Sequence, residues 1–211
     1  MWSVIVAAGS GSRFGRTLPK QYEMLAGRRV VDWSIDAARS VSNGIVLVVA
    51  EAYAEQPEPS VDVVVVGGPE RSDSVRAGLT AVPETDVIVV HDAARPLASF
   101  ALFGEVVMTV REGVDGAVPG IRPVDTIKRV DSSGQVNETL DRNDLRAVQT
   151  PQAFRAAILR EAHATGQRAT DDAALVEAIG GKVKVVLGDL QNIKITHEAD
   201  LAYAEQLLTD R

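Results

Sequence analysis

The chain has 211 residues, of which 45% are hydrophobic and 24% are charged, and it contains no cysteine. That length and composition suit one globular domain with a sizeable core. The net charge of −7 disfavours a general nucleic-acid-binding protein, because such proteins present a basic surface. Without cysteine, disulfides, zinc–thiolate sites, iron–sulfur clusters and thiol nucleophiles are excluded.

The apolar runs are short. Residues 45–50 and 63–66 are typical of them, far below the roughly 20 residues that a membrane-spanning helix needs. Met1-Trp2-Ser3 is followed directly by strand-like residues, with neither the basic segment nor the cleavage site of a secretory signal. We therefore expect a cytoplasmic protein that does not associate with membranes.

The first half of the chain alternates strand-like and helix-like segments. Nearly continuous aliphatic runs predict strands covered on both faces, at Val4–Ala7, Ile45–Ala50, Val61–Val66 and Val87–His91. Helices are expected at Val30–Arg39, Ser72–Ala81 and Phe100–Glu112. This alternation predicts an α/β fold with a Rossmann-like, mostly parallel sheet flanked by helices. The strand-to-helix loops would then meet at one sheet edge, where such folds bind ligands.

The pattern changes after Gly113. Residues 114–150 contain strand-like pieces without helical periodicity. Val124–Val130 and Gln135–Leu140 are expected to pair across a turn at residues 131–134, but a hairpin with so little apolar surface is not stable alone. We predict an arm of about residues 122–146 that a partner subunit covers. A polar edge hairpin in solvent explains the pattern equally well.

Helical patterns return in the last third of the chain. Helices are predicted at Phe154–Ala164, Asp171–Ile179 and Glu198–Leu208, with short strands at Lys182–Leu187 and Ile193–Ile195. No repeat, low-complexity tract or linker divides the sequence. Residues 1–211 are therefore expected to form a single domain, with the arm as a subdomain.

Positive charge gathers at the start of this acidic chain. Residues 1–30 contain five cationic side chains and one acid, Glu23, a local excess of 5 − 1 = +4. A cationic, glycine-rich segment on an acidic protein favours a site for a compact anion. A solvated charged loop is the alternative for a basic cluster of this size.

The first strand is followed by a glycine-rich loop, Ala7-Ala8-Gly9-Ser10-Gly11-Ser12-Arg13. Glycines let such a turn bring backbone N–H groups close to phosphate oxygens. The dinucleotide-binding motif is disfavoured because Phe14 stands where its third glycine would be, and the P-loop motif because its lysine is missing. A glycine turn with the cations Arg13 and Lys20 instead indicates a triphosphate site.

A second cluster, His91-Asp92-Ala93-Ala94-Arg95-Pro96, follows the predicted strand at 87–91. Asp92 would lie at a strand end, where its carboxylate can face a metal ion or a ribose, and Arg95 would reach a bound phosphate. An Asp–Arg pair that shapes the loop is the alternative. We interpret His91 as structural, and we assign no chemistry to His163 or His197 because the sequence offers them no carboxylate partner.

Taken together, the motifs resemble those of the 2-C-methyl-D-erythritol 4-phosphate cytidylyltransferases, enzymes of the non-mevalonate isoprenoid pathway, over essentially the whole chain. Besides the glycine loop, the matching segments are Pro19-Lys20-Gln21-Tyr22, Arg71-x-x-Ser74-Val75, Asp92-Ala93-Ala94-Arg95-Pro96, Asp125-Thr126-Ile127-Lys128, Asp141-Arg142, Thr150-Pro151-Gln152, Thr170-Asp171-Asp172 and Asn192-Ile193-Lys194-Ile195-Thr196. Each segment alone is a weak signal, but their order and spacing are specific.

The resemblance implies roles for these positions. Arg13 and Lys20 would contact the CTP phosphates and stabilise the transition state, whereas Arg142 and Lys194 would orient the phosphate of the sugar-alcohol substrate. Residues expected to line the nucleotide site are Ala7, Ala8, Gly9, Ser10, Gly11, Gly68, Ser74, Asp92 and Ala93. Residues expected on the acceptor side are Arg95, Thr126, Thr150 and Thr170, with Asp92 also near Mg²⁺. Thr126 and Arg142 would act in the neighbouring subunit of a homodimer.

One position departs from the pattern. Pro69 stands where the family leads us to expect a polar residue with a free N–H, so base recognition would depend on Gly68 or on a carbonyl instead. Two other functions remain open from the sequence, a ribitol-5-phosphate cytidylyltransferase and a non-catalytic CTP-binding regulator.

Overall fold

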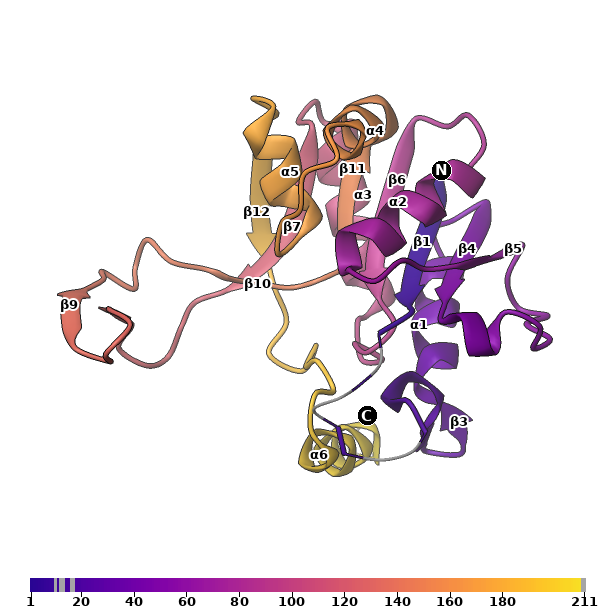
Figure 1. The fold of residues 1–211 in the computed structure, drawn as a ribbon, viewed down its shortest axis with the longest axis horizontal. Helices are drawn as coiled ribbons and strands as arrows, with labels where there is room; N and C mark the ends of the chain where they lie inside the picture. The colour runs from indigo at the N-terminus through magenta and orange to yellow at the C-terminus, as the bar shows by residue number, and fades with distance from the viewer. Residues whose placement is uncertain (10, 12–13, 16–17, 210–211) are drawn as a thin grey trace.

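The computed structural model describes residues 1–9, 11, 14–15 and 18–209, and its main feature is a mixed sheet (Figure 1). Seven strands follow the order β10-β7-β11-β6-β1-β4-β5, and β12 also pairs with β7. Their bounds are β1 Trp2–Ala7, β4 Gly44–Val49, β5 Val63–Val66, β6 Val87–Asp92, β7 Gly116–Ile121, β10 Ala147–Val148, β11 Gln152–Arg155 and β12 Val183–Leu187. The α/β class and the predominance of parallel strands in the first half are confirmed.

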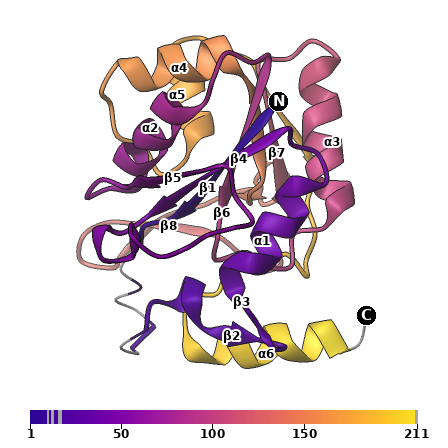
Figure 2. The ribbon, with the colours of Figure 1, turned by 90° about the vertical axis from the view of Figure 1, so that its right-hand side faces the viewer.

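Helices cover both faces of this sheet, as Figure 2 shows. On one face lie α1 (Val30–Arg39) and α3 (Phe100–Arg111), packed against side chains such as Ile5, Leu47 and Val89. On the other lie α2 (Arg71–Ala81), α4 (Ala156–Ala164) and α5 (Asp172–Ala178). They pack against the strand residues adjacent in sequence to those of the first face, such as Val4, Val46 and Ile88. Successive strand residues face opposite sides. Burial on both faces therefore explains the continuous aliphatic runs.

The strands β6, β1, β4 and β5 run parallel to one another. Their carboxyl ends therefore meet at one edge, which brings the loops after β1, β5 and β6 together, as predicted. A prediction further along the chain was wrong. The helix expected from Phe154 begins at Ala156, because Gln152–Arg155 is strand β11, inserted antiparallel between β6 and β7. Phe154 is fully buried in that strand.

A smaller layer lies below the carboxyl edge of the sheet (Figure 2). It contains η1 (Lys20–Tyr22), the β2–β3 hairpin (Met24–Leu25 with Arg28–Arg29) and α6 (Glu198–Thr209), packed around a separate core with Leu25 and Ile195. The short helix η2 (Glu51–Tyr53) follows β4. The strand predicted at Ile193–Ile195 is absent from the described elements, because this segment bonds a loop instead: the Ile195 N–H donates to the Ala94 carbonyl at 2.8 Å.

The predicted hairpin is present but shorter than expected, with β8 (Lys128–Val130) paired to β9 (Val136–Thr139). It projects away from the sheet (Figure 1), and every residue of both strands is exposed. Among the described residues, no helix has the length and hydrophobicity that crossing a membrane requires.

Candidate active site

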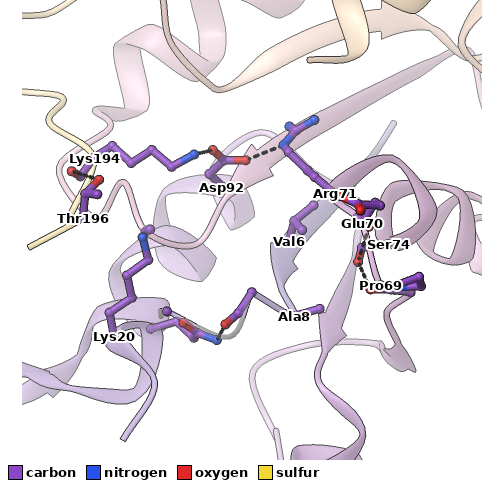
Figure 3. A pocket seen from close by; sticks show the side chains of 15 residues that line it. Val6, Ala8, Lys20, Pro69, Glu70, Arg71, Ser74, Asp92, Lys194 and Thr196 are labelled. Carbon is purple, nitrogen blue, oxygen red and sulfur yellow. Dashed lines mark hydrogen bonds and ion pairs between the residues drawn. The ribbon is translucent and has the colours of Figure 1, made fainter. Parts of the chain in front are cut away.

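A cavity of about 440 Å³ opens at the carboxyl edge of the sheet (Figure 3). Its walls come from the loops after β1, β5 and β6, from η1 and from residues 194–196. Of the predicted site residues, it brings together Ala8, Gly9, Gly11, Lys20, Gly68, Ser74, Asp92 and Lys194. Ser10 and Arg13, which lie in the same loop, are outside the described residues.

The loops after β1 and β5 approach each other closely. A Cβ on Gly67 would lie 2.4 Å from the Ala8 Cβ, and one on Gly68 would lie 2.4 Å from the Asp73 Cβ, so both positions require glycine. The Ser74 hydroxyl lies 3.2 Å from the Gly68 carbonyl and 3.1 Å from the Glu70 carbonyl, to which it can donate. The close approach of Gly67 to Ala8 thus joins the loops after β1 and β5 at the wall of the cavity.

Ala7 and Ala93, also predicted at the nucleotide site, are buried and do not line the cavity. The Ala7 carbonyl accepts a hydrogen bond from Gln21, and the Ala93 carbonyl accepts one from Ser34. The carbonyl oxygens of these two residues thus already have one hydrogen-bond donor each within the protein.

Two ammonium groups from distant parts of the chain enter the cavity. The Lys20 Nζ donates to the Ile195 carbonyl at 2.6 Å, and the Lys194 Nζ donates to the Asp92 Oδ2 at 2.6 Å. Figure 3 shows Lys194 and Arg71 reaching Asp92 from opposite sides, with Lys20 pointing into the same space. The arrangement concentrates positive charge where an anion would bind.

Asp92 is held between two cations. Its Oδ1 accepts from the Arg71 Nε at 3.0 Å while its Oδ2 accepts from Lys194. Burial alone would raise the pKa of the Asp92 carboxyl, but the charges of Arg71 and Lys194 hold this pKa well below its usual range. Asp92 is therefore a carboxylate at neutral pH.

The charge chain continues behind Arg71. The Arg71 Nη1 donates to the Asp172 Oδ2 at 2.8 Å, and the Asp172 Oδ1 lies 2.9 Å from the His163 Nε2. Burial would raise the pKa of Asp172, but Arg71 and then His163 lower it. The inference that His163 lacks a carboxylate partner was wrong. Its partner is nine residues away on the next helix, where sequence spacing gives no signal.

A second, smaller cavity of about 100 Å³ adjoins the first and shares Arg71, Asp92 and Lys194 with it. Three predicted acceptor-side residues, Arg95, Thr150 and Thr170, line it. The Arg95 Nη1 donates to the Asn192 carbonyl at 2.7 Å. The Arg95 Nε and the Arg71 Nη2 are buried nitrogens without an acceptor among the described residues.

The hydrogen bonds around His91 determine its tautomer. The Asp92 N–H donates to the Thr150 Oγ1 at 3.1 Å, so the Thr150 hydroxyl is free to donate to the His91 Nδ1, 2.9 Å away. The His91 Nε2 lies 3.2 Å from the Arg95 carbonyl, which can only accept, so Nε2 carries the proton. His91 is thus a neutral structural side chain, as predicted.

The protonation of His91 predicts a loss of stability in mild acid. Burial lowers the pKa of His91 to about 3 in the folded protein, whereas the unfolded value is about 6.5. Below about pH 6.5 the unfolded state binds a proton that the folded state does not, so stability falls as the pH drops toward 3. Between pH 7 and pH 5 we expect the free energy of unfolding to fall by about 2 kcal/mol. Urea denaturation at each pH would measure this loss.

The matched control for this prediction is His197, which is exposed. His91→Gln is expected to flatten the pH dependence between 7 and 5, whereas His197→Gln leaves it unchanged. An unchanged slope in His91→Gln would contradict the prediction.

The sequence of this chain matches a known family along almost its whole length. The model of the IspD family, described as 2-C-methyl-D-erythritol 4-phosphate cytidylyltransferase, matches residues 1–210. The chain belongs to this family. The family member from Nocardia farcinica is 47% identical over 216 residues, covering 99% of this chain and 94% of its own, and that from Rhodococcus jostii is 40% identical over 214 residues, covering 99% and 95%. The crystal structure of the Thermus thermophilus 2-C-methyl-D-erythritol 4-phosphate cytidylyltransferase aligns with a TM-score of 0.84 at 33% identity and covers 98% of both chains.

Two of the residues that the cytidylyltransferase resemblance singled out lie away from both cavities. Thr126 and Arg142 belong to the projecting arm, where the exposed Arg142 guanidinium donates to the Val124 carbonyl. Within one chain, therefore, Lys20 and Lys194 line the same cavity, whereas Arg142 lines a different one on the arm.

Arg71 and Gln21 are among the site residues that were not assigned a role from the sequence. Arg71 lies within the family motif Arg71-x-x-Ser74-Val75, and Gln21 follows Lys20 in another motif. Both line the 440 Å³ cavity. Their presence in motifs was a signal, but their partners could be identified only from the fold.

Asp92 offers its carboxylate as a protein ligand for a divalent cation. Among the residues that the structure describes, no group of three or more His, Cys, Asp or Glu side chains is placed to hold a metal ion. The donor set does not suit an all-protein metal cage. It does fit Mg²⁺, which typically takes one or two carboxylates and completes its shell with substrate phosphates and water.

Proposed function

We propose that this protein joins CTP to 2-C-methyl-D-erythritol 4-phosphate, forming 4-diphosphocytidyl-2-C-methyl-D-erythritol and pyrophosphate for isoprenoid precursor synthesis. The observation that carries the proposal is the convergence of Lys20 and Lys194 on one cavity beside the glycine loop. Membership of the cytidylyltransferase family supports the choice of substrates. A cytoplasmic location and the absence of a nucleic-acid partner stay predictions from the sequence.

The reaction needs little acid–base chemistry from the protein. A phosphate monoester has its second pKa near about 6, so the acceptor is largely a dianion at neutral pH. One of its oxygens forms a bond to the α-phosphorus of CTP, and the bond from that phosphorus to the bridging oxygen breaks, releasing pyrophosphate with the electron pair. The neutral His91, with both ring nitrogens hydrogen-bonded, has no role as a base here.

The difficulty of this reaction is electrostatic. Two anions must approach, and negative charge grows on the oxygens around the α-phosphorus. We assign Lys20, together with Arg13, to the triphosphate, and Lys194 to the phosphate of the acceptor. Arg71 and Arg95 line the second cavity, and their positive charges suit an anionic acceptor. Fixed cations of this kind stabilise the transition state without reorganising.

We further propose that Mg²⁺ accompanies the triphosphate, with Asp92 as its protein ligand. The ion would neutralise charge on the phosphate oxygens. In the protein alone, the Asp92 Oδ1 accepts from Arg71 and the Oδ2 from Lys194, so Mg²⁺ would share this carboxylate with two cationic side chains.

The direct test is pyrophosphate release from CTP and Mg²⁺ in the presence of each candidate acceptor. We expect release with 2-C-methyl-D-erythritol 4-phosphate and a much lower kcat/KM with ribitol 5-phosphate. Preference for ribitol 5-phosphate would assign the protein to the sister activity. Tight CTP binding without pyrophosphate formation from either acceptor would indicate a regulator.

We propose that the arm, about residues 122–146 of the single domain 1–211, acts in a homodimer. Three observations support this: both strands of the hairpin are exposed, Val124 at the base of the arm is 79% exposed, and nearby Leu187 is 87% exposed. Apolar surface of this kind is stabilised when a second copy covers it. Arg142 and Thr126 would then complete the acceptor site of the neighbouring subunit.

Arg142→Ala tests the role of the arm. If Arg142 binds the acceptor phosphate, the variant should raise the KM for 2-C-methyl-D-erythritol 4-phosphate by roughly tenfold or more, since a charge-assisted hydrogen bond contributes about 1.5–3 kcal/mol. The KM for CTP should stay close to that of the wild type. An equal rise in both constants in steady-state kinetics would contradict this assignment.

Mixing two variants tests whether the arm acts across subunits. Arg142→Ala and Lys20→Ala chains, mixed equally and allowed to exchange, should form heterodimers as about half of all dimers, each with one intact site of two. The expected activity is about a quarter of that of the wild type. No recovery on mixing would mean that Arg142 serves its own subunit.

A further inference from the structure

Gln21 is a buried polar side chain for which the proposed reaction gives no role. It is 3% exposed and lies in η1, directly after Lys20. Its Nε2 donates to two carbonyl oxygens of the glycine loop, that of Ala7 at 2.5 Å and that of Gly9 at 3.0 Å. A carboxamide nitrogen carries two protons, so one Gln21 side chain can satisfy both carbonyls at once.

These hydrogen bonds determine which way the loop presents its backbone. In a trans peptide the C=O and N–H groups point in opposite directions. With the Ala7 carbonyl turned toward Gln21, the N–H of Ala8 points away from it. A carbonyl oxygen facing a triphosphate would repel it, whereas an N–H attracts it. The amide of Gln21 therefore holds the carbonyl oxygens of Ala7 and Gly9, with their partial negative charges, in hydrogen bonds beside the proposed phosphate site.

Further contacts hold the short helix η1, which carries Lys20, in place relative to the loop. Gly11, which has φ of 65°, packs against η1, and a Cβ at this position would lie 3.6 Å from the backbone nitrogen of Lys20. On the other side of Gln21, the Tyr22 ring stacks on Tyr53 with centroids 4.1 Å apart. Residues 7–9 and 11 of the glycine loop and the short helix carrying Lys20 thus form one unit, and Gln21 is a side chain that joins them.

We propose that Gln21 is a positioning residue, which holds the glycine loop and the Lys20 ammonium in a common register for the triphosphate. This inference rests on the proposed function, in which that site binds CTP. It predicts that loss of the two amide donors affects the nucleotide and leaves binding of the acceptor unchanged.

The test compares three substitutions. Gln21→Met keeps the length of the side chain but removes both donors, Gln21→Glu replaces them with a carboxylate oxygen, and Gln21→Asn keeps the donors on a chain one methylene shorter. We expect the KM and the Kd for CTP to rise roughly 10- to 100-fold in Gln21→Met, because the buried Ala7 carbonyl and the part-buried Gly9 carbonyl both lose their donor. The rise should be larger in Gln21→Glu and smaller in Gln21→Asn, and the KM for the acceptor should change less than about twofold.

A merely structural role would lower the fraction of active protein and leave both KM values unchanged, and that result would overturn the proposal. Equal rises in both KM values would do the same. Gln206→Met, on an exposed position of α6, is the matched control and should behave as the wild type. If Gln21→Met does not fold by circular dichroism, the graded rise in Gln21→Asn and Gln21→Glu decides the question.

The design separates this proposal from the proposed function. If the wild-type protein released no pyrophosphate, the proposed function would fail, but calorimetry with CTP would still measure the role of Gln21. Weaker CTP binding by Gln21→Met than by the wild type and Gln206→Met would support the positioning role. Equal CTP binding by all three proteins would refute it.

Discussion

Lys20→Ala is expected to lower kcat by roughly 10²–10³-fold, the effect of removing one fixed group that stabilises transition-state charge, about 3–4 kcal/mol. The Lys20 Nζ lies within the cavity, anchored on the Ile195 carbonyl at 2.6 Å, so its charge is in position before CTP binds. Preorganisation of this kind contributes most in the transition state, where the charge on the α-phosphoryl oxygens is greatest.

Single-turnover and steady-state measurements of pyrophosphate release would check this result. Lys182→Ala is the matched control, because Lys182 is exposed near the start of β12, on the opposite edge of the sheet from β5. A loss in Lys20→Ala that appears only in the KM for CTP, with kcat retained, would show that Lys20 binds the ground state and transition state equally. That outcome would contradict its assignment to the transition state.

Asp172→Ala is expected to lower the free energy of unfolding by about 3–5 kcal/mol, the usual cost of removing one partner from a buried charge pair. The Asp172 side chain is 1% exposed and accepts from Arg71 while pairing with His163. Burial would lower the pKa of the Arg71 guanidinium, but Asp172 and Asp92 raise it. Removing Asp172 therefore leaves this buried cation with only one carboxylate partner.

Urea denaturation at neutral pH would measure the loss. The control is Asp36→Ala, which breaks an exposed pair with Arg28 in which the side chains are 41% and 51% exposed, and should cost no more than about 1 kcal/mol. Asp172→Asn keeps one acceptor oxygen and should fall between the two. If Asp172→Ala were no more destabilised than Asp36→Ala, the buried charge chain would not stabilise the fold.

The two halves of the chain differ in how well their elements could be predicted. The helix at Val30–Arg39 has the predicted bounds, and strands β1, β4, β5 and β6 lie within two residues of theirs. These elements carry strong local signals, since continuous aliphatic runs and amphipathic stretches need few distant contacts to be recognised. Gln152–Arg155 carries no such signal. It is a strand because β6 and β7 flank it, and the helical pattern after it hid the boundary.

The site shows the same division. The glycine loop, Lys20, Asp92 and Lys194 were predicted as site residues from motif order, and the fold brings Gly9, Gly11, Lys20, Asp92 and Lys194 to one cavity. The roles of Arg71, Asp172 and His163 could not be predicted. Arg71 and Asp172 are 101 residues apart in sequence, and their pairing follows from the packing of α2 beside α4 and α5.

The sequence by itself determined the α/β class, the glycine-rich loop after the first strand and the family, because each depends on residue types at short, ordered spacings. Only the tertiary structure decided which charges are paired, which carbonyls Gln21 bonds and which side chains line the cavity. The physical reason is that burial and hydrogen bonding are set by neighbours in space, and a lysine 102 residues from its aspartate becomes that neighbour only when the sheet has formed.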